Sequence, residues 1–242
     1  NINDIDHPSV RECFKFLKIN DGLEINMISD LPARTGLGSS SAFTVGLLNT
    51  LYASKGVMVS KERLANDAIN VEQKLIKERV GSQDQFHAAF GGFNKFTFNK
   101  NNIDVFPLPV TEKNIKSLNN NLLLFYTKQT RYASEILEEQ LNQTISGIND
   151  KFLKKMYDMV DESIQYLINN DIESFGALLD SSWNYKRELS KSISNKDIDD
   201  WYYSAIKSGA YGGKLLGAGG GGFLIFVVPV NKKRSVRKVL NN

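Results

Sequence analysis

The spacing of apolar residues along the chain predicts a few short strands. Leu23, Ile25 and Met27 alternate with polar residues, so they predict a half-buried strand that ends near Ser29. Short runs rich in apolar residues predict the remaining strands at 93–98, 105–108, 122–126 and 223–228. Long stretches of helical spacing interrupt this series, which indicates an α+β protein.

Helical spacing dominates the rest of the sequence. Leu47 and Leu51 lie on one helical face, and Lys55–Gly56 ends this helix. Ser60 is the predicted N-cap of a second helix that continues to Arg79. Further helices are predicted at 85–90, 136–141, 152–167, 175–189 and 198–206. The polar stretch at 111–121 is the best candidate for a domain boundary, so we expect two lobes, at 1–112 and 113–242.

Composition and charge narrow the class of protein. The 242 residues are 41% hydrophobic, which is enough to bury one large core or two smaller ones. The net charge of +3 favours an anionic substrate such as a nucleotide, but it is too small to indicate a nucleic-acid-binding protein. Cys13 is the only cysteine, and the chain has neither a membrane-spanning run nor a signal peptide, so we expect a cytoplasmic protein. Cys13 itself is expected to fill space in a core rather than to act as a nucleophile.

A loop rich in glycine and serine follows the first predicted strand. It extends from Gly36 to Ser41, after a turn at Pro32. Glycine lets backbone N–H groups approach an anion, the helix that begins near Ser40 adds the positive end of its dipole, and hydroxyl groups bind phosphate or metal. The loop lacks the Gly-Lys-Ser/Thr of a Walker A loop and the third glycine of a dinucleotide-binding fingerprint. It therefore predicts a phosphate-binding loop of another kind.

This segment resembles the second signature motif of the GHMP kinases, which are named for galactokinase, homoserine kinase, mevalonate kinase and phosphomevalonate kinase. The resemblance implies that Gly36, Gly38 and Ser39 contact the phosphates of ATP and that Ser40 binds Mg²⁺. The full set of residues expected to bind the nucleotide is Pro32, Gly36, Leu37, Gly38, Ser39, Ser40 and Ser41. The implied fold has two lobes, the first like a ribosomal protein domain and the second ferredoxin-like, with helices on an antiparallel sheet.

Two carboxylates are candidates for metal binding and proton transfer. Glu72 taken alone is an ordinary exposed helix residue, but GHMP kinases place a metal-binding Glu in this helix, before a Gly-x-x-Asp-Gln motif that stands here as Gly81–Gln85. The resemblance therefore assigns Glu72 to the metal and Asp84 to the catalytic base. Asp84 lies where the preceding helix has ended and a short helix begins, so nearby N–H groups should keep it ionised. A role as a simple helix N-cap is chemically reasonable and is compatible with that of the base. His87 is expected to be packed and structural.

A second glycine-rich loop is predicted from Gly212 to Gly222, before the last apolar strand. Each glycine costs conformational entropy, so a run of them makes sense only where the backbone approaches something closely. The loop resembles the third GHMP motif, which implies that Gly219, Gly220 and Gly221 line the substrate site. Segments at 84–94, 123–127, 131–134 and 209–215 resemble the heptose 7-phosphate 1-kinases, and the whole resemblance spans residues 5–230.

The resemblance implies an ATP- and Mg²⁺-dependent kinase that phosphorylates the anomeric hydroxyl of a sugar or sugar phosphate. D-glycero-D-manno-heptose 7-phosphate is the leading substrate, and its 1-phosphate would serve nucleotide-sugar or surface-polysaccharide synthesis. A phosphate on the substrate needs fixed cations. The candidates are Lys128, Arg131, Lys186, Arg187 and Lys214, of which Arg131 and Lys214 are the first choice.

Three alternatives stay open. The chain could act on an unphosphorylated sugar, as galactokinases and fucokinases do, or it could be a non-catalytic sensor of sugar and nucleotide. An RNA-binding protein is disfavoured by the small net charge and by the lack of interleaved basic and aromatic residues. The expected partners are ATP and a small sugar or sugar phosphate, without nucleic acid or membrane, in a monomer or homodimer.

The ends of the chain depart from the GHMP pattern. The first GHMP motif is absent, and the chain opens at Asn1 rather than at a methionine. It stops at Asn242, where related kinases continue into a closing strand. We therefore expect a trimmed piece of a kinase, without assured activity of its own and with an exposed sheet edge.

Overall fold

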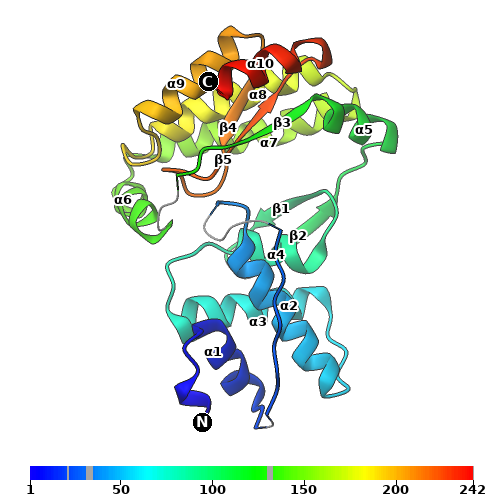
Figure 1. The fold of residues 1–242 in the computed structure, drawn as a ribbon, viewed down its shortest axis with the longest axis vertical. Coiled ribbons are helices and arrows are strands. Elements are labelled where there is room, and N and C mark those ends of the chain that lie inside the picture. Colours follow the sequence, from blue (N-terminus) through cyan, green and yellow to red (C-terminus); the bar gives the residue numbers. More distant parts are fainter. Residues whose placement is uncertain (21, 31–34, 130–132, 242) are drawn as a thin grey trace. The chain divides into compact units, whose positions relative to one another are not determined.

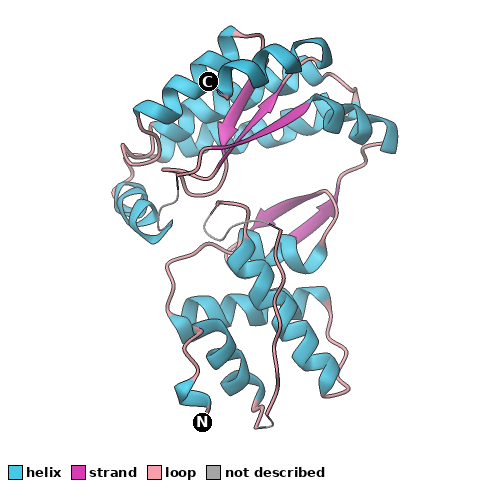
Figure 2. Cartoon of the chain, in the orientation of Figure 1, coloured by secondary structure: helices cyan, strands magenta, loops and turns pink. Residues whose placement is uncertain are grey.

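The computed structural model describes residues 1–20, 22–30, 35–129 and 133–241. Contacts divide the chain into two units. Unit 1 contains the described residues up to position 30 and Gly38–Pro107, and unit 2 contains Thr35–Leu37 and the described residues from Leu108 onward. Helices accompany two small antiparallel sheets, so the predicted α+β class is confirmed (Figures 1 and 2). No helix in these described ranges is both long and apolar enough to span a bilayer.

Unit 1 consists of short helices and one β-hairpin. Its elements are η1 (Ile2–Asp4), α1 (Pro8–Leu17), α2 (Ser39–Ser54), α3 (Lys61–Ile69), η2 (Asn70–Ile76), α4 (Gln83–Phe90), β1 (Asn94–Phe98) and β2 (Ile103–Pro107). The predicted N-cap of α3 is confirmed, since Ser60 Oγ accepts a hydrogen bond from the N–H of Arg63 at 3.1 Å. The second helix was expected to reach Arg79, but it ends earlier because Lys77 adopts a left-handed conformation with φ 65°. Its last part, η2, is a π-helix.

The core of unit 1 lies between α1, α2 and η2. Cys13, Leu48 and Val71 come from these three elements, and each is fully buried. Burial, together with the charge of Glu72, raises the pKa of the Cys13 thiol to about 12, so the thiol stays protonated. The prediction that Cys13 fills space in a core is confirmed.

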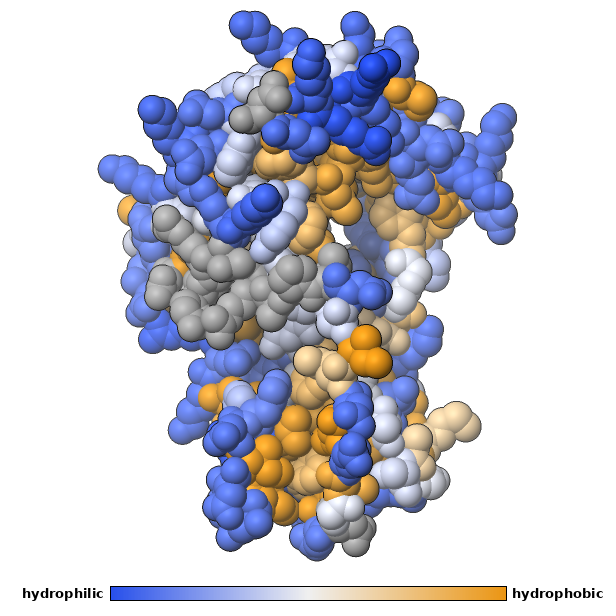
Figure 3. Space-filling model, in the orientation of Figure 1, coloured by the Kyte–Doolittle hydropathy of each residue, from blue (hydrophilic) through white to orange (hydrophobic). Residues whose placement is uncertain are grey.

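The strand predicted at 23–27 is wrong. The segment forms no strand, and its apolar side chains are exposed: Leu23 to 48%, Met27 to 62% and the following Ile28 to 96%. A strand needs a neighbour to pair its N–H and C=O groups, and within the described residues of unit 1, β1 and β2 pair only with each other. Apolar surface is visible on this unit in Figure 3. Alternation alone was therefore an insufficient signal.

Unit 2 contains a three-stranded antiparallel sheet with the strand order β3-β5-β4. Its elements are α5 (Glu112–Asn121), β3 (Leu122–Tyr126), α6 (Ala133–Ile145), α7 (Asp150–Ile168), α8 (Ile172–Arg187), α9 (Lys196–Lys207), β4 (Gly212–Leu215), β5 (Phe223–Val227), η3 (Val230–Lys232) and α10 (Lys233–Leu240). The polar stretch at 111–121 is helix α5, for which the Thr111 side chain is the N-cap.

Each face of this sheet packs against helices. On one face, Leu224 and Phe226 of β5 are fully buried in a core that also contains Tyr202 of α9 and Val236 of α10. On the other face, α8 lies directly on β4, because a Cβ atom added to Gly212 would lie 1.9 Å from the carbonyl oxygen of Gly176. The second glycine-rich loop was expected to begin at Gly212; instead, its first residues form β4, where glycine allows close helix–strand packing.

Candidate functional site

The first glycine-rich loop leads into helix α2 at Gly38. Gly36 and Gly38 have φ of 78° and 71°, in the left-handed region that glycine adopts without strain. Gly38 is the N-cap residue of α2, and no described side chain caps this helix. The N–H groups of Ser39 and Ser40 in the first turn are therefore available to an anion. This is the arrangement that the predicted phosphate site requires.

Asp84 lies beside this helix start. A Cβ atom added to Gly38 would lie 3.2 Å from the Asp84 carboxyl carbon and 3.4 Å from its Oδ2, so only glycine leaves the carboxyl group this close to α2. Ser82, not Asp84, is the N-cap residue of α4, so the N-cap role for Asp84 is wrong. Part of the residue is exposed, yet burial raises the pKa of its carboxyl group, while the charge of His87 opposes this. The expected stabilisation by nearby N–H groups is therefore not the dominant effect.

Glu72 is a buried carboxylate with one unused oxygen. Only 1% of the residue is exposed, and its Oε2 accepts hydrogen bonds from Ser41 Oγ at 2.9 Å and from Gln85 Nε2. Its Oε1 is buried without a hydrogen-bond partner among the described residues. Glu72 belongs to the π-helix η2, and π-helical turns occur frequently at functional sites. A buried carboxylate oxygen without a donor is costly, so a ligand of positive charge fits this position.

The cluster differs from the predicted one in its serine. Ser41, not Ser40, donates to Glu72, while Ser40 is exposed and its carbonyl accepts a hydrogen bond from Thr44 Oγ1. Gln85 was not predicted as a site residue, although it follows Asp84 in the same motif. Its place in that motif was the available signal, and the structure buries Gln85 completely.

The donor set fits Mg²⁺ better than a metal held by protein alone. Among the residues that the structure describes, no three His, Cys, Asp or Glu side chains gather to hold a metal. Mg²⁺ is commonly bound through one or two protein oxygens together with phosphates and water. The free Oε1 of Glu72 and the serine hydroxyl groups at the start of α2 provide such oxygens.

The second glycine-rich loop packs against Thr35–Leu37, which belong to the same unit. A Cβ atom added to Gly217 would lie 2.5 Å from the Cα of Gly36, and one added to Gly222 would lie 2.2 Å from the carbonyl oxygen of Thr35. Backbone therefore crosses backbone here with no room for side chains.

The three glycines expected to line the substrate site have specific neighbours in unit 2. Gly219 lies against the backbone of Ile193, and Gly221 lies against that of Gln129, since added Cβ atoms would come within 2.8 and 2.5 Å of them. Gly220 donates its N–H to the Ile193 carbonyl at 2.8 Å. These contacts alone explain much of the glycine content of the loop.

The predicted cations have different surroundings. Lys186 on α8 donates to the carbonyl oxygen of Gly217 in the loop. Burial lowers the pKa of Lys186 to about 7, with a further contribution from the charge of Lys214, and burial also lowers the pKa of Lys214. Arg187 instead forms an ion pair with Asp199 at 3.2 Å. Among the described candidates, Lys186 therefore contacts the loop, and Lys214 lies close enough to act on the charge of Lys186.

Several other expectations have plain outcomes. Pro32 and Arg131 lie outside the described residues. His87 is exposed rather than packed within a core, although its ring lies 4.3 Å from that of Phe96. Lys128 is exposed.

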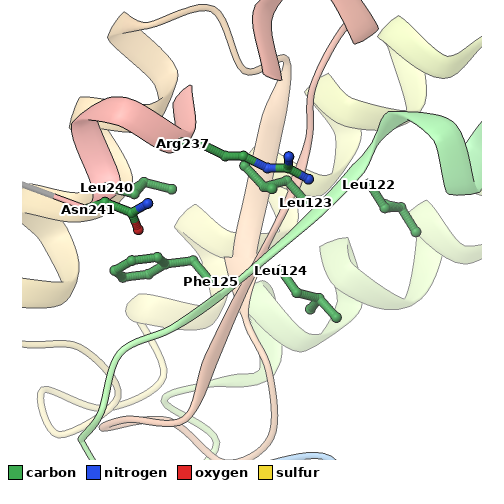
Figure 4. A pocket seen from close by; sticks show the side chains of 7 residues that line it. All are labelled: Leu122, Leu123, Leu124, Phe125, Arg237, Leu240 and Asn241. Carbon is green, nitrogen blue, oxygen red and sulfur yellow. The ribbon is translucent and has the colours of Figure 1, made fainter. Parts of the chain in front are cut away.

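A pocket of about 280 Å³ between β3 and α10 contains none of the predicted site residues (Figure 4). Its lining residues are Leu122, Leu123, Leu124, Phe125, Arg237, Leu240 and Asn241.

Comparison with known proteins gives matches along most of the chain. Residues 9–92 match the family model for the GHMP kinases N terminal domain, and residues 163–242 match that for GHMP kinases C terminal. D-glycero-alpha-D-manno-heptose 7-phosphate kinase of Campylobacter jejuni is 31% identical over 229 residues, which cover 93% of this chain and 67% of that protein. The bifunctional fucokinase/GDP-fucose pyrophosphorylase of Arabidopsis thaliana is 28% identical over 90% of this chain and 21% of its own length. The galactokinase of Pyrococcus furiosus is 25% identical over 89% of this chain and 67% of its own length.

Solved structures share the fold. A D-glycero-D-manno-heptose 1-phosphate kinase from Bacteroides thetaiotaomicron has a TM-score of 0.64 at 24% identity, covering 97% of this chain and 67% of that chain. Phosphomevalonate kinase of Streptococcus pneumoniae has a TM-score of 0.77 at 16% identity, covering 98% and 78%. The chain spans about two thirds or less of the three curated relatives above.

Proposed function

The chain belongs to the GHMP kinases, and from this premise we propose that it transfers the γ-phosphate of ATP to the anomeric hydroxyl of a sugar phosphate. The leading substrate is D-glycero-D-manno-heptose 7-phosphate, which would gain a phosphate at position 1. The most direct support is the buried Glu72 carboxylate, with one unpartnered oxygen, hydrogen-bonded to Ser41 in the first turn of α2.

The nucleotide is assigned to the start of α2. The uncapped N–H groups of Ser39 and Ser40 bind phosphate oxygens, with help from the helix dipole. Gly36 and Leu37 belong to the loop that leads into α2. The family resemblance adds Pro32 to this set of nucleotide-binding residues. Phosphoryl transfer depends mainly on positioning and on neutralising charge, and both are tasks that a rigid helix terminus performs.

The metal is assigned to Glu72, with Ser40 or Ser41 as its hydroxyl neighbour. A bound Mg²⁺ supplies positive charge to the phosphate oxygens as the phosphoryl group moves. Ser41 and Gln85 orient the Glu72 carboxylate through hydrogen bonds to Oε2, and Oε1, which has no donor among the described residues, is left for the ligand.

Asp84 is assigned as the base. Its carboxylate orients the anomeric hydroxyl and accepts its proton while the hydroxyl oxygen bonds to the γ-phosphorus and ADP leaves. Burial raises the pKa of Asp84, which makes its carboxylate a stronger base than that of an ordinary aspartate.

The sugar phosphate is favoured over a free sugar by two observations. The Campylobacter heptose 7-phosphate kinase is 31% identical to this chain, which is higher than the 28% and 25% of the fucokinase and galactokinase relatives. The second observation is that the charge of Lys214 acts on Lys186, whose side chain donates to the Gly217 carbonyl of the second glycine-rich loop. We assign the substrate phosphate to Lys214 and, by resemblance, to Arg131. The resemblance also assigns Gly219, Gly220 and Gly221 to the substrate site.

A substrate panel tests the proposal. ADP formation is measured with purified full-length protein, MgATP, and heptose 7-phosphate, free heptose, galactose, fucose or mevalonate. We expect turnover with heptose 7-phosphate to exceed that with each other compound. Faster turnover of a free sugar would favour the galactokinase or fucokinase alternative. Sugar-dependent nucleotide binding without turnover would favour a sensor.

A further inference from the structure

Two lysines of unit 2 meet at the second glycine-rich loop without a balancing carboxylate. Lys186 extends from the last turn of α8, and Lys214 from β4, the strand on which α8 packs. Neither lysine forms an ion pair with any residue the structure describes. Asp180, which precedes Lys186 on α8, accepts hydrogen bonds from Tyr202 and Asn184 instead.

The loop itself adds unused hydrogen-bond donors. The N–H groups of Gly220 and Gly222 bind the carbonyl oxygens of Ile193 and Gln129. By contrast, the N–H groups at 217–219 have no acceptor within the described residues. Gly217 and Gly219 have φ of 72° and 129°, a backbone geometry in which successive N–H groups can converge on an anion.

Partly buried cations of the same sign repel each other and lose solvation, so their pairing needs a compensating anion. The hydrogen bond from Lys186 to the Gly217 carbonyl satisfies one donor of the amino group but supplies no negative charge to balance it. We propose that Lys186, Lys214 and the loop N–H groups at 217–219 form the receptor for a dianionic phosphate group on the sugar substrate. This inference rests on the proposed kinase function, and it identifies Lys186, rather than Lys214 alone, as the residue that distinguishes a sugar phosphate from a free sugar.

A phosphate monoester fits this receptor better than a carboxylate or a neutral sugar. Near neutral pH it carries nearly two negative charges and three acceptor oxygens, which match two ammonium groups and several N–H donors. The lowered pKa of both lysines agrees with this geometry, since bound phosphate would restore their full positive charge.

The test compares Lys186→Gln with Lys207→Gln, an exposed lysine at the end of α9, in the full-length protein. We expect Lys186→Gln to raise the KM for heptose 7-phosphate at least tenfold. The KM for ATP and the kcat/KM for free heptose should change less than twofold. Lys186→Arg should restore part of the affinity, and Lys207→Gln should match the wild type.

Two kinetic outcomes would overturn the proposal, and a separate binding measurement tests the receptor without turnover. Equal losses with phosphorylated and free heptose would mean that Lys186 only holds the Gly217 loop, and a raised KM for ATP would mean that the pair binds nucleotide phosphate. If the wild type phosphorylates no sugar, the proposed function fails. Calorimetry then measures the affinity for inorganic phosphate, which tests the receptor independently of the kinase reaction. Binding that is at least tenfold weaker in folded Lys186→Gln than in the wild type supports the receptor. Equal or absent binding rejects it.

Discussion

The two glycine-rich loops look alike in sequence, but glycine serves different purposes in them. In the first loop, Gly38 leaves room for the Asp84 carboxyl group and begins a helix whose first N–H groups are free. In the second loop, Gly217 and Gly222 allow the backbone to cross the backbone of Thr35–Leu37. Charge also differs, since the first loop lies near two carboxylates and the second lies beside two lysines. Composition alone therefore does not distinguish a glycine-rich loop at a helix start from one that crosses another backbone segment.

The largest expected effect is at Asp84. Asp84→Asn keeps the shape of the side chain beside Gly38 but removes the base, so we expect kcat to fall by about 10²–10⁴-fold. The KM for ATP should stay near that of the wild type. Steady-state kinetics with heptose 7-phosphate measures both, with Asp200→Asn, an exposed residue of α9, as the control. Unchanged kcat would remove Asp84 from the mechanism.

The next effect is at Glu72. Glu72→Gln removes the negative charge that is assigned to Mg²⁺, so we expect kcat to fall by about 10²–10³-fold, with partial recovery at high Mg²⁺. The rate is measured across Mg²⁺ concentrations, with the exposed Glu62→Gln at the start of α3 as the matched control. A loss that Mg²⁺ does not relieve, together with lower thermal stability, would indicate that Glu72 is structural.

A pair of glycine substitutions separates crowded from open positions. Gly222→Ala would place a Cβ 2.2 Å from the Thr35 carbonyl oxygen at a φ of 100°, so we expect it to lower the free energy of unfolding by at least about 2 kcal/mol. Gly46→Ala, in the interior of α2 with nothing within 4 Å of the added Cβ, should raise it by about 0.5–1 kcal/mol. Denaturant unfolding measures both changes. Equal effects would show that the crossing of the loops is not a tight one.

The smallest expected effect is a pH dependence at Lys186. Burial lowers the pKa of Lys186 from its ordinary value of 10.5 to about 7 in the folded protein, so the unfolded chain binds more protons than the folded protein between these pH values. The contribution of the Lys186 amino group to the free energy of unfolding therefore increases as pH rises above 7. We expect the melting temperature of the wild type to gain on that of Lys186→Gln between pH 7 and pH 9. A constant difference would contradict the lowered pKa.

Much of the fold was accessible from local sequence patterns. The helix after Ser60 has an N-cap, the helix around Leu47 has helical spacing, and the apolar runs at 122–126 and 223–228 pair as strands. The segment at 23–27 shows the limit of such patterns, because strand formation depends on a partner that local alternation does not reveal. Gly212 shows another limit, since its close contact with Gly176 depends on how α8 packs.

The family motifs pointed to residues of the candidate site, but they did not predict which side chains contact one another there. The motif resemblance selected Glu72 and Asp84, and the structure shows Glu72 hydrogen-bonded to Ser41 and Gln85 and Asp84 beside Gly38. It did not distinguish Ser40 from Ser41, because only the rotation of α2 relative to η2 decides which hydroxyl reaches Glu72. Lys186 was one of five cations, and its contact with Gly217 comes from two segments distant in sequence.

Mg²⁺-dependent ATP binding is the most direct test of the central claim that Glu72 and the start of α2 hold a metal–nucleotide complex. Calorimetry compares ATP binding with Mg²⁺ and with EDTA for the folded wild type and for Glu72→Gln. We predict that Mg²⁺ strengthens binding to the wild type and that Glu72→Gln removes most of this gain. The same gain in both proteins would contradict the assignment.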